Sequence, residues 1–585
     1  MNRKRLASLA SLLTLALLAG NLAGCGKATP TVTVPSATTT PETASTTAAA
    51  TTGNPNISAP GQLPVVKNKE TIRVVLCQSA NIISYNYGEN RLTTWLEDRT
   101  NVHVEPVLFA AAEDLVKLKI DLSSASDLGD LLLIPMSRAN LAEYGAQGKL
   151  APLGDLMKTH GYNLKNLMDK NPGAYPAITA PDGNIYGLPF SGPSSLSPDA
   201  YAERLWIHSG FLAKYGKGMP RTTEELYSFL KWVKATDVNG NGLNDEVGWT
   251  GSEKRTVTYA RPTDFLMNAF TLQDQDGYYR KDDVIHCAMV EDGYRNGLRF
   301  LARLMAEGLM DENYIGNDEK TLKSLVALEG GNTVAAISAA GMGLAAPTDE
   351  IKLKYEPVSP LTGPDGFVNA FYDQTSLSVT TGRASISAKS ERKDIAMAWM
   401  DANCSEEVAL RARFGELGVD WEIPAAGTLA IDGGPARFRV LRDQWGVPTY
   451  AHWFTSSPAM IGYDPLTSLP KPAGTYDPDA IAYKAARASE KQVIPCSLPL
   501  FYFDQATSDK TAAWKAAIND RCRSAICEFI AGARNINDDA AWAGYVAEAR
   551  QAGLDDYLKT MQTEYDRVWK GALPKTYTSV PQRTK

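Results

Sequence analysis

The sequence predicts an α/β fold built from more than one domain-sized unit. Thr71–Leu76 has the composition of a strand, and alternating valines predict a second strand over Val102–Val107, with a helix at Arg91–Thr100 between them. The apolar run Gly129–Ile134, which ends at Pro135, is typical of a buried parallel strand. At 585 residues the chain exceeds the roughly 250 to 300 residues at which single cores stop growing, so we expect at least two cores.

Later elements follow the same logic. Thr222–Glu225 is a potential capping box, and it precedes an amphipathic helix whose apolar face is Leu226, Phe229, Leu230 and Val233. A second apolar stripe comprises Leu298, Leu301, Leu304 and Met305. Both stripes predict core packing rather than a cofactor or lipid surface. Val334–Ala340 and Gly382–Ala388 predict further strands deep in the chain.

Charge excludes one broad class of function. The chain has 59 Lys and Arg against 66 Asp and Glu, a formal charge of −7, and 44% hydrophobic residues. A general nucleic-acid binder needs a basic face that releases counterions from phosphates, so nucleic acid is not an expected partner.

The N-terminus predicts export. Basic residues at 3–5 precede an apolar run over 6–20, which is short of the roughly 20 residues that a membrane-spanning helix needs. Leu22–Cys25 resembles the lipobox of bacterial lipoproteins, in which the cysteine carries the diacyl (palmitate-type) anchor and becomes the new N-terminus. The alternative is an ordinary secretory signal in which Cys25 is incidental. Loss of residues 1–24 would remove three basic side chains and leave a balance of −10.

The next segment predicts a tether. Residues 25–64 are rich in Thr, Ala, Pro and Ser and contain no aromatic residue, so they cannot form a core. A flexible chain of this length has an end-to-end distance of about 35 Å. The protein is therefore expected on the outer face of the cell membrane, or on its periplasmic side if the organism has an outer membrane. Six scattered cysteines remain, and buried free thiols are a simpler expectation than a disulfide framework.

The most specific motif is a loop that predicts a calcium ion. Oxygen-bearing side chains alternate from Asp237, a glycine follows at the sixth position, and carboxylates come next, as a hard cation requires. Position 12 is Gly248, so the bidentate glutamate of an EF-hand is missing. The predicted ligands are Asp237, Asn239, Asn241, the carbonyl of Leu243, Asp245 and Glu246. The alternative is a polar Asn-Gly turn after a helix.

Catalytic signatures give no positive support for an enzyme. No His-Glu-x-x-His, Gly-x-Ser-x-Gly or Cys-x-x-Cys motif is present. Gly341–Ala346 matches a dinucleotide fingerprint formally, but Pro347 prevents a long helix, so a glycine-rich turn is the better interpretation. A pair of carboxylates for glycoside hydrolysis stays open, because sequence spacing does not give distance in space.

Aromatic residues in turn-rich contexts favour a carbohydrate ligand as a group, because sugar rings stack on aromatic faces. For each residue alone, a packing role is the simpler interpretation. The candidate ligand-binding residues are Tyr85, Tyr87, Tyr372, Arg383, Trp421 and Trp453.

Ordered landmarks over roughly residues 70–430 resemble the large extracellular solute-binding lipoproteins of bacterial carbohydrate ABC importers (family 1, alginate-binding-protein-like). They include the segments 130–134, 148–153, 181–189, 204–208, 219–226, 306–311, 360–366 and 415–422. Calcium binding in that family uses the same loop, which supports the ligand set above. The chain from 430 to 585 matches only loosely.

The resemblance implies a two-lobed periplasmic-binding-protein-like (type II) fold. Lobe 1 would comprise residues 65–189 and about 360–425, and lobe 2 residues 190–359 and about 426–585. The implied function is capture of an oligosaccharide in the interlobe cleft and delivery to ABC permease subunits, by a monomer that is not an enzyme. A membrane-anchored glycan-active enzyme and a sensory or adhesive lipoprotein of the same fold are the alternatives.

Overall fold

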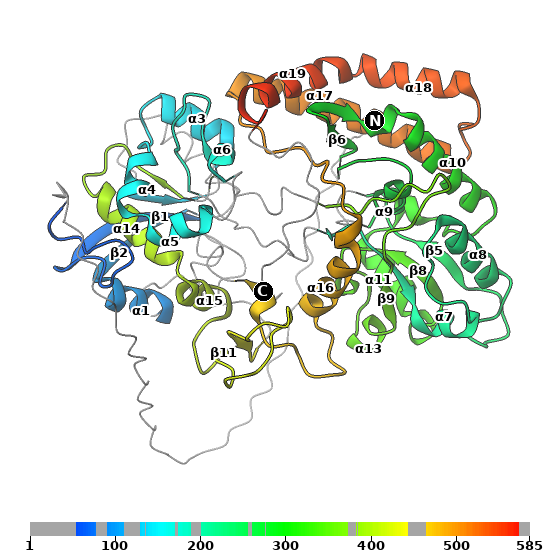
Figure 1. Ribbon diagram of the computed structural model, residues 1–585, viewed down its shortest axis with the longest axis horizontal. Helices are drawn as coiled ribbons and strands as arrows, with labels where there is room; N and C mark the ends of the chain where they lie inside the picture. The colour runs from blue at the N-terminus through cyan, green and yellow to red at the C-terminus, as the bar shows by residue number, and fades with distance from the viewer. Residues whose placement is uncertain are drawn as a thin grey trace, which may run out of the picture. The chain divides into compact units, whose positions relative to one another are not determined.

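Two four-stranded sheets, each with helices on both faces, form the framework of the protein (Figure 1). The computed structural model describes residues 54–77, 90–109, 129–134, 136–169, 174–188, 201–254, 260–274, 276–372, 382, 384–442 and 464–571. The α/β class predicted from the sequence is confirmed. Cys25 and most of the predicted tether lie outside the described residues. No helix in the described part of the chain is long and apolar enough to cross a membrane.

The first sheet has the strand order β10-β3-β1-β2. Its strands are β1 (Glu70–Cys77), β2 (Val102–Phe109), β3 (Leu131–Leu133) and β10 (Ser385–Ile386). β1 pairs in parallel with both β2 and β3, whereas β10 joins β3 antiparallel. The strand predicted over Gly382–Ala388 is thus only two residues long in the structure. It lies at the edge of the first sheet, in the half of the protein that the predicted lobe bounds assign to it.

Alternation along β1 produces the two apolar layers of this half. Ile72, Val74 and Leu76 are buried on one face, which is covered by α1 (Arg91–Thr100), α4 (Gly154–His160), α5 (Tyr162–Met168), α6 (Ala174–Ile178), α14 (Lys393–Asn403) and α15 (Glu406–Phe414). Val75 points to the opposite face, which is covered by α3 (Arg138–Ala146). The period of two expected for a strand buried on both faces is therefore present.

The second sheet has the order β5-β8-β4-β9, with β4 (Leu205–His208), β5 (Val247–Thr250), β8 (Val334–Ser338) and β9 (Tyr355–Pro357). One face packs on α7 (Ser209–Tyr215), α8 (Thr223–Lys234), α9 (Pro262–Leu266), α10 (Asp292–Ala306) and α17 (Gln505–Ile530). The other face packs on α11 (Glu319–Ala327), α12 (Met342–Ala345), α13 (Asp349–Lys352) and the end of α16 (Pro478–Ser489).

The C-terminal helices complete the larger core. α18 (Asp539–Gln551) and α19 (Leu554–Val568) run along α17, as Figure 1 shows, and bury Tyr545 and Tyr565 in the same core as the second sheet. A hairpin of β6 (Tyr278–Lys281) and β7 (Val284–Cys287) lies under them. A separate small hairpin pairs β11 (Trp421–Glu422) with β12 (Arg439–Val440).

Helix predictions are confirmed with one change of detail. Leu226, Phe229, Leu230 and Val233 are buried, and Thr222 Oγ1 accepts a hydrogen bond from the Glu225 N–H at 3.1 Å. The Glu225 carboxylate, however, accepts from the N–H of Arg221 at 2.7 Å, one residue before the cap. In a standard capping box the glutamate would accept from the N–H of Thr222 itself, so this half of the motif is shifted by one residue.

The folded body begins earlier than the sequence indicates. Residues 54–69, here named the strap, form a small hairpin in which Ile57 pairs with Val66. Val65 and Val66 are buried in the first core. Residues 54–64, which the sequence assigns to the tether, thus take part in this hairpin through Ile57, whereas Val65 and Val66 fall in the predicted lobe 1.

Candidate functional site

Open α/β sheets bind ligands outside the carboxyl ends of their strands. In the first sheet the carboxyl ends of β1, β2 and β3 share one edge, since all three strands are parallel. The chain that leaves this edge, residues 78–89, 110–128 and 135, lies outside the described residues. Tyr85 and Tyr87 belong to residues 78–89, and Arg383 and Trp453 also lie outside the described residues. The roles of these four residues therefore stay predictions.

The corresponding edge of the second sheet is described. β5 and β8 are parallel and β4 is antiparallel to β8, so the start of β4 meets the ends of the other two. Glu203 and Arg204 precede β4, Glu253 follows β5, and Ala340 follows β8. The Arg204 guanidinium donates to the carbonyl of Ala340, which joins two of these chain ends.

Buried polar side chains converge behind this edge. Asp264 accepts from the guanidinium of Arg261 at 2.7 Å, and both are buried. Asn268 donates to Glu203 Oε2 at 3.2 Å. Burial raises the pKa of Glu203 well above its usual range, and also raises the pKa of Glu253 to about 7. The site therefore contains acids that favour the neutral form, which the sequence patterns did not indicate.

Tyr372 lies beside this region. Its ring packs edge-on against Tyr201, with 5.2 Å between ring centroids, and its side chain is 8% exposed. Trp421 is 3% exposed and packs with Leu410 and Phe438, and its indole N–H donates to the Gly415 carbonyl at 3.0 Å. That placement favours a packing role for Trp421.

The loop predicted to bind calcium folds as a tight turn around Asp237. Its two carboxylate oxygens accept from the N–H groups of Gly240, Asn241 and Gly242 at 2.7 to 3.1 Å. Among the described residues, no three His, Cys, Asp or Glu side chains lie close enough to form a metal cluster. The amide of Asn241 instead donates to Asp245.

Glu246 provides the clearest fit for a cation in this loop. Its Oε1 accepts from the N–H groups of Val238 and Asn239, while its Oε2 is buried and has no hydrogen-bond partner among the described residues. A buried carboxylate oxygen without a donor is costly, and a cation would satisfy it.

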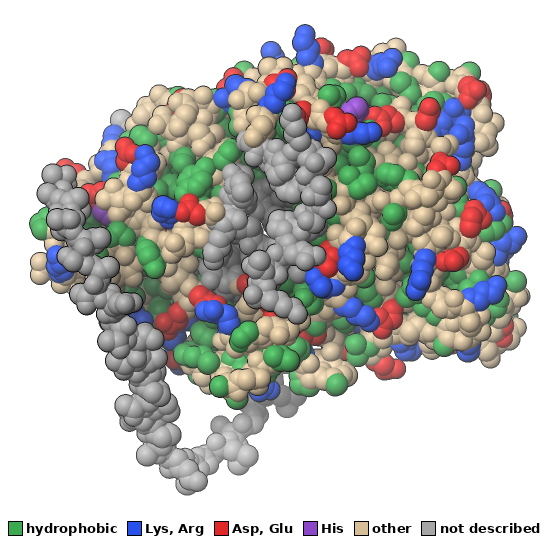
Figure 2. Space-filling view, in the orientation of Figure 1, with side chains coloured by type: hydrophobic (Ala, Val, Ile, Leu, Met, Phe, Trp, Pro, Cys, Tyr) green, Lys and Arg blue, Asp and Glu red, His purple; other side chains and the backbone are tan. Residues whose placement is uncertain are grey.

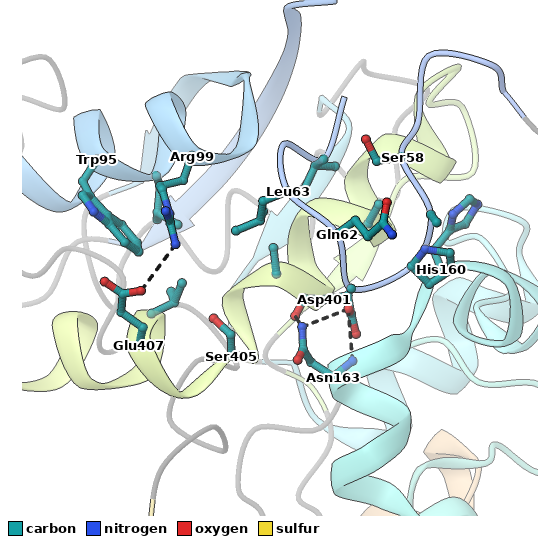
Figure 3. A pocket seen from close by; sticks show the side chains of 18 residues that line it. Ser58, Gln62, Leu63, Trp95, Arg99, His160, Asn163, Asp401, Ser405 and Glu407 are labelled. Atoms are coloured by element: carbon teal, nitrogen blue, oxygen red, sulfur yellow. Dashed lines mark hydrogen bonds and ion pairs between the residues drawn. The ribbon is translucent and has the colours of Figure 1, made fainter. Parts of the chain in front are cut away.

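A different cavity, of about 190 Å³, lies between the strap, α1, α14 and α15 (Figure 3). Its charged side chains are already paired: Asp401 accepts from Asn163, and Arg99 lies 3.6 Å from Glu407. Because the charged side chains that line this cavity already have partners, we interpret it as imperfect packing under the strap and not as a ligand site.

The surface charge is mixed on the face that Figure 2 draws. On the face shown in Figure 2, Lys and Arg side chains are interspersed with Asp and Glu, without a broad basic patch. The described cysteines 287, 404, 496, 522 and 527 are free thiols.

Comparison with known proteins decides the fold. No family model matches the sequence. The fructooligosaccharide ABC transporter substrate-binding protein FusA of Streptococcus pneumoniae serotype 4 is 25% identical over an alignment of 548 residues, and the match covers 88% of this chain and 94% of FusA. Lipoprotein LipO of Bacillus subtilis is 22% identical over 249 residues, 41% of this chain and 47% of LipO.

Solved structures agree. A solute-binding protein from Bifidobacterium longum infantis, described as binding HMO, superposes with a TM-score of 0.66 at 21% identity, covering 85% of this chain and 99% of its own. An EF-hand mutant of FusA in complex with fructo-nystose superposes with a TM-score of 0.61 at 22% sequence identity. The match covers 86% of this chain and 100% of the FusA chain. The chain has the two-lobed fold of the ABC-importer solute-binding proteins. The resemblance stated from the sequence is therefore confirmed. Alginate-binding protein AlgQ2, in a structure without calcium ion, superposes with a TM-score of 0.55 at 19% sequence identity. The match covers 86% of this chain and 99% of the AlgQ2 chain.

Within this solute-binding fold, sequence reasoning missed the buried network of Glu203, Asn268 and Asn369. These residues are far apart along the chain and belong to no motif, so only the fold brings them together. The single available signal was that Glu203 directly precedes the landmark segment 204–208.

Proposed function

We propose that this protein is the substrate-binding lipoprotein of an ABC importer, which captures an oligosaccharide between its lobes and delivers it to permease subunits in the membrane. The observation that carries this proposal is the alignment with FusA, because it spans 94% of FusA and 88% of this chain. A match of that extent relates most of the length of both proteins rather than one shared module.

The ligand site is proposed at the carboxyl edges of the two sheets. Aromatic side chains there would stack on the apolar faces of sugar rings, while polar groups bind hydroxyls. Tyr85, Tyr87, Arg383 and Trp453, which lie outside the described residues, are proposed as ligand contacts. Tyr372 is proposed as a contact at the second sheet, where its ring packs on Tyr201.

Calorimetry with the full exported chain tests this proposal. Kestose, fructo-nystose and HMO form the panel, because the descriptions of structural relatives name these ligands. Binding of at least one of them with a micromolar or tighter dissociation constant supports the oligosaccharide proposal. Binding of peptides or amino acids alone would overturn it.

The alternatives have different signatures. A glycan-active enzyme would release shorter products from the same panel during overnight incubation, and we expect the oligosaccharides to be recovered intact. A sensory or adhesive lipoprotein would bind sugar but support no uptake. Loss of oligosaccharide import in cells that lack this chain, restored by its return, distinguishes an importer component from that alternative.

A structural calcium ion is proposed in the loop at 237–246, with Asp237, Asn239, Asn241, the Leu243 carbonyl, Asp245 and Glu246 as ligands. The buried, partnerless Oε2 of Glu246 supports it. The ion would neutralise carboxylates that now receive only N–H donors, and would fix the turn between α8 and β5. In this proposal it stabilises the loop and does not contact the sugar.

Lipidation of Cys25 is proposed as the membrane anchor, with residues 1–24 removed as a signal peptide. Metabolic labelling with a palmitate analogue would mark the wild-type protein and not the Cys25→Ser variant. The body is proposed to act as a monomer, and light scattering of the tether-free protein checks that state.

A further inference from the structure

The first turn of α3 lies at the carboxyl edge of the first sheet. β3 ends at Leu133, and α3 begins soon afterwards at Arg138, with Ser137 as its N-cap. The carboxyl end of β3 shares this edge with β1 and β2, and open α/β sheets bind ligands at such edges. The first turn of α3 contains no acidic side chain, so the positive end of the helix dipole is not balanced from within the helix.

Arg138 is held at this turn without a counter-ion. Its Nε donates to the Ala177 carbonyl at 3.3 Å, which orients the guanidinium. Its Nη2 is buried and has no hydrogen-bond partner, and no carboxylate of the described residues forms an ion pair with it. The buried guanidinium groups of Arg261 and Arg295, in contrast, lie 2.7 and 2.8 Å from carboxylates. A largely buried cation without a partner is costly, and an anion would satisfy it.

Tyr502 reaches the same site from a distant part of the chain. Its side chain is 3% exposed and packs with Met136 and Leu141 in the core that α3 covers. Its neighbours Phe501 and Phe503 stack on each other, with 5.9 Å between ring centroids, and pack against the larger core instead. The Tyr502 hydroxyl is buried and, within the described ranges, has no hydrogen-bond partner either.

The charges around these two groups make both of them donors. Burial lowers the pKa of the Arg138 guanidinium, and its interaction with Tyr502 acts in the opposite direction. Burial raises the pKa of Tyr502, so its hydroxyl keeps its proton at neutral pH. The Asp182 carboxylate also acts on Tyr502, but it already accepts from the Tyr186 hydroxyl at 2.7 Å and from the Asn184 N–H at 3.0 Å.

An anionic group matches this arrangement better than a neutral hydroxyl does. The planar guanidinium of an arginine binds the two oxygens of a carboxylate, and a phenolic hydroxyl can donate to one of them. The N-terminus of a helix favours negative charge in the same place. A sugar hydroxyl could accept from Arg138 but would leave its charge uncompensated.

We propose that Arg138 and Tyr502, at the first turn of α3, form a subsite for the carboxylate of an acidic sugar within the oligosaccharide. This subsite rests on the function proposed above and narrows it to glycans that carry a uronic or sialic acid. Arg138 belongs to the first core and Tyr502 to a segment whose neighbouring rings pack on the larger core, so the carboxylate is contacted from both.

Calorimetry with the full exported chain tests the subsite by comparing an acidic oligosaccharide with its methyl ester, which keeps the size of the ligand and removes its charge. Sialyllactose and a uronate trisaccharide are the probes. Wild type should bind each acid about tenfold or more tighter than its ester, the effect of one hydrogen-bonded ion pair. Arg138→Gln should bind acid and ester alike, and Tyr502→Phe should lose several-fold in affinity for the acid and nothing for the ester.

Arg392→Gln is the matched control. Its side chain is 47% exposed and lies 3.9 Å from Glu70, the first residue of β1, so it removes the same charge at the opposite edge of the sheet. This variant should retain the preference of wild type for the acid.

Equal affinities of wild type for acid and ester would overturn the proposal, and this comparison needs no variant to fold. A preference for the acid that persists in Arg138→Gln would overturn it as well. If millimolar acetate or sulfate raises the thermal midpoint of wild type but not of Arg138→Gln, while acid and ester bind alike, the site takes a free anion only and the sugar assignment is wrong. Binding of neutral kestose without any preference for acids removes the subsite and leaves the proposed function, whereas no binding of any oligosaccharide counts against that function itself.

Discussion

The carboxylate of Asp401, on α14, accepts a hydrogen bond from the backbone N–H of Leu164 at 2.8 Å and thereby caps a helix to which it does not belong. The same carboxylate accepts from the Asn163 N–H at 3.1 Å. α5 begins after Gly161, which has no side chain to cap it, so the first turn of this helix depends on α14 for its hydrogen-bond acceptor.

Replacement of Asp401 by alanine should therefore destabilise the first core. It leaves two N–H groups at a buried helix end without an acceptor, at a cost of about 2 to 4 kcal/mol. Urea unfolding followed by circular dichroism measures the change. Asp155→Ala, whose side chain is 96% exposed, is the control and should have little effect. Equal losses for the two variants would contradict the capping role.

His208 should make stability depend on pH in the acidic range. Its Nδ1 accepts from the N–H groups of Gly210 and Phe211, which requires an unprotonated nitrogen, and burial, followed by Lys354, lowers its pKa to about 4. In the unfolded chain the His208 imidazole binds a proton as pH falls below about 6.5, whereas in the folded chain it binds one only near pH 4. The free energy of unfolding therefore falls by about 3 kcal/mol as pH drops from about 6.5 to 4.

The variant His208→Asn separates this titration from the cap. Asparagine can cap a helix without titrating, so the slope of unfolding free energy against pH between 4 and 6.5 should become shallower than in wild type. His103→Asn, at a side chain 48% exposed, should retain the wild-type slope. An unchanged slope in His208→Asn would show that another group is responsible.

Calcium should raise the thermal midpoint of the protein, and a chelator should reverse the rise. At a concentration 100 times its dissociation constant, a ligand that binds only the folded state adds about 2.7 kcal/mol. Asp237→Ala should abolish the response to calcium. Asn244→Ala changes an exposed residue of the same loop that is not a proposed ligand, and should retain the response. A calcium-dependent shift that persists in Asp237→Ala would exclude the proposed site.

Gln562 should be needed to dock α19 on the β6–β7 hairpin. Its side chain accepts from the Ile285 N–H and donates to the Asp283 carbonyl, both at 2.9 Å. Gln562→Ala should cost about 1 to 2 kcal/mol and increase proteolysis of the C-terminal helices. Gln551→Ala, on the exposed end of α18, serves as the control. Unchanged proteolysis would show that burial of Tyr565 alone holds the helix.

Much of the framework could be predicted because local patterns agree with the fold. β1, β3 and α8 each carry an apolar period that matches their burial, and the landmarks along the chain placed them in the right family of folds. The strap could not be predicted in this way, because Ile57, Val65 and Val66 are isolated among residues typical of a flexible segment. Their burial depends on α1 and α14, which are distant in sequence.

The site was less predictable for a related reason. The calcium loop has a contiguous signature, so Asp237 to Glu246 could be identified as a unit. The network in which Asn369 Nδ2 donates to Asn268 Oδ1 and Asn268 Nδ2 donates to Glu203 Oε2 has no such signature, because residues 203, 268 and 369 are far apart along the chain and only the fold brings them together. Aromatic content indicated a sugar ligand, yet could not distinguish Trp421, which is buried in a small core, from a side chain that faces a ligand.

The strap also determines which part of the folded protein would first bear a pulling force applied through the chain before residue 54. Tension along the chain before Asn54 would reach the Ile57–Val66 bridge first, together with the bond from the Lys67 N–H to the Asn56 carbonyl at 2.8 Å. Because the Val66 N–H also donates to the Thr100 carbonyl at the end of α1, the force would pass into one face of the first sheet.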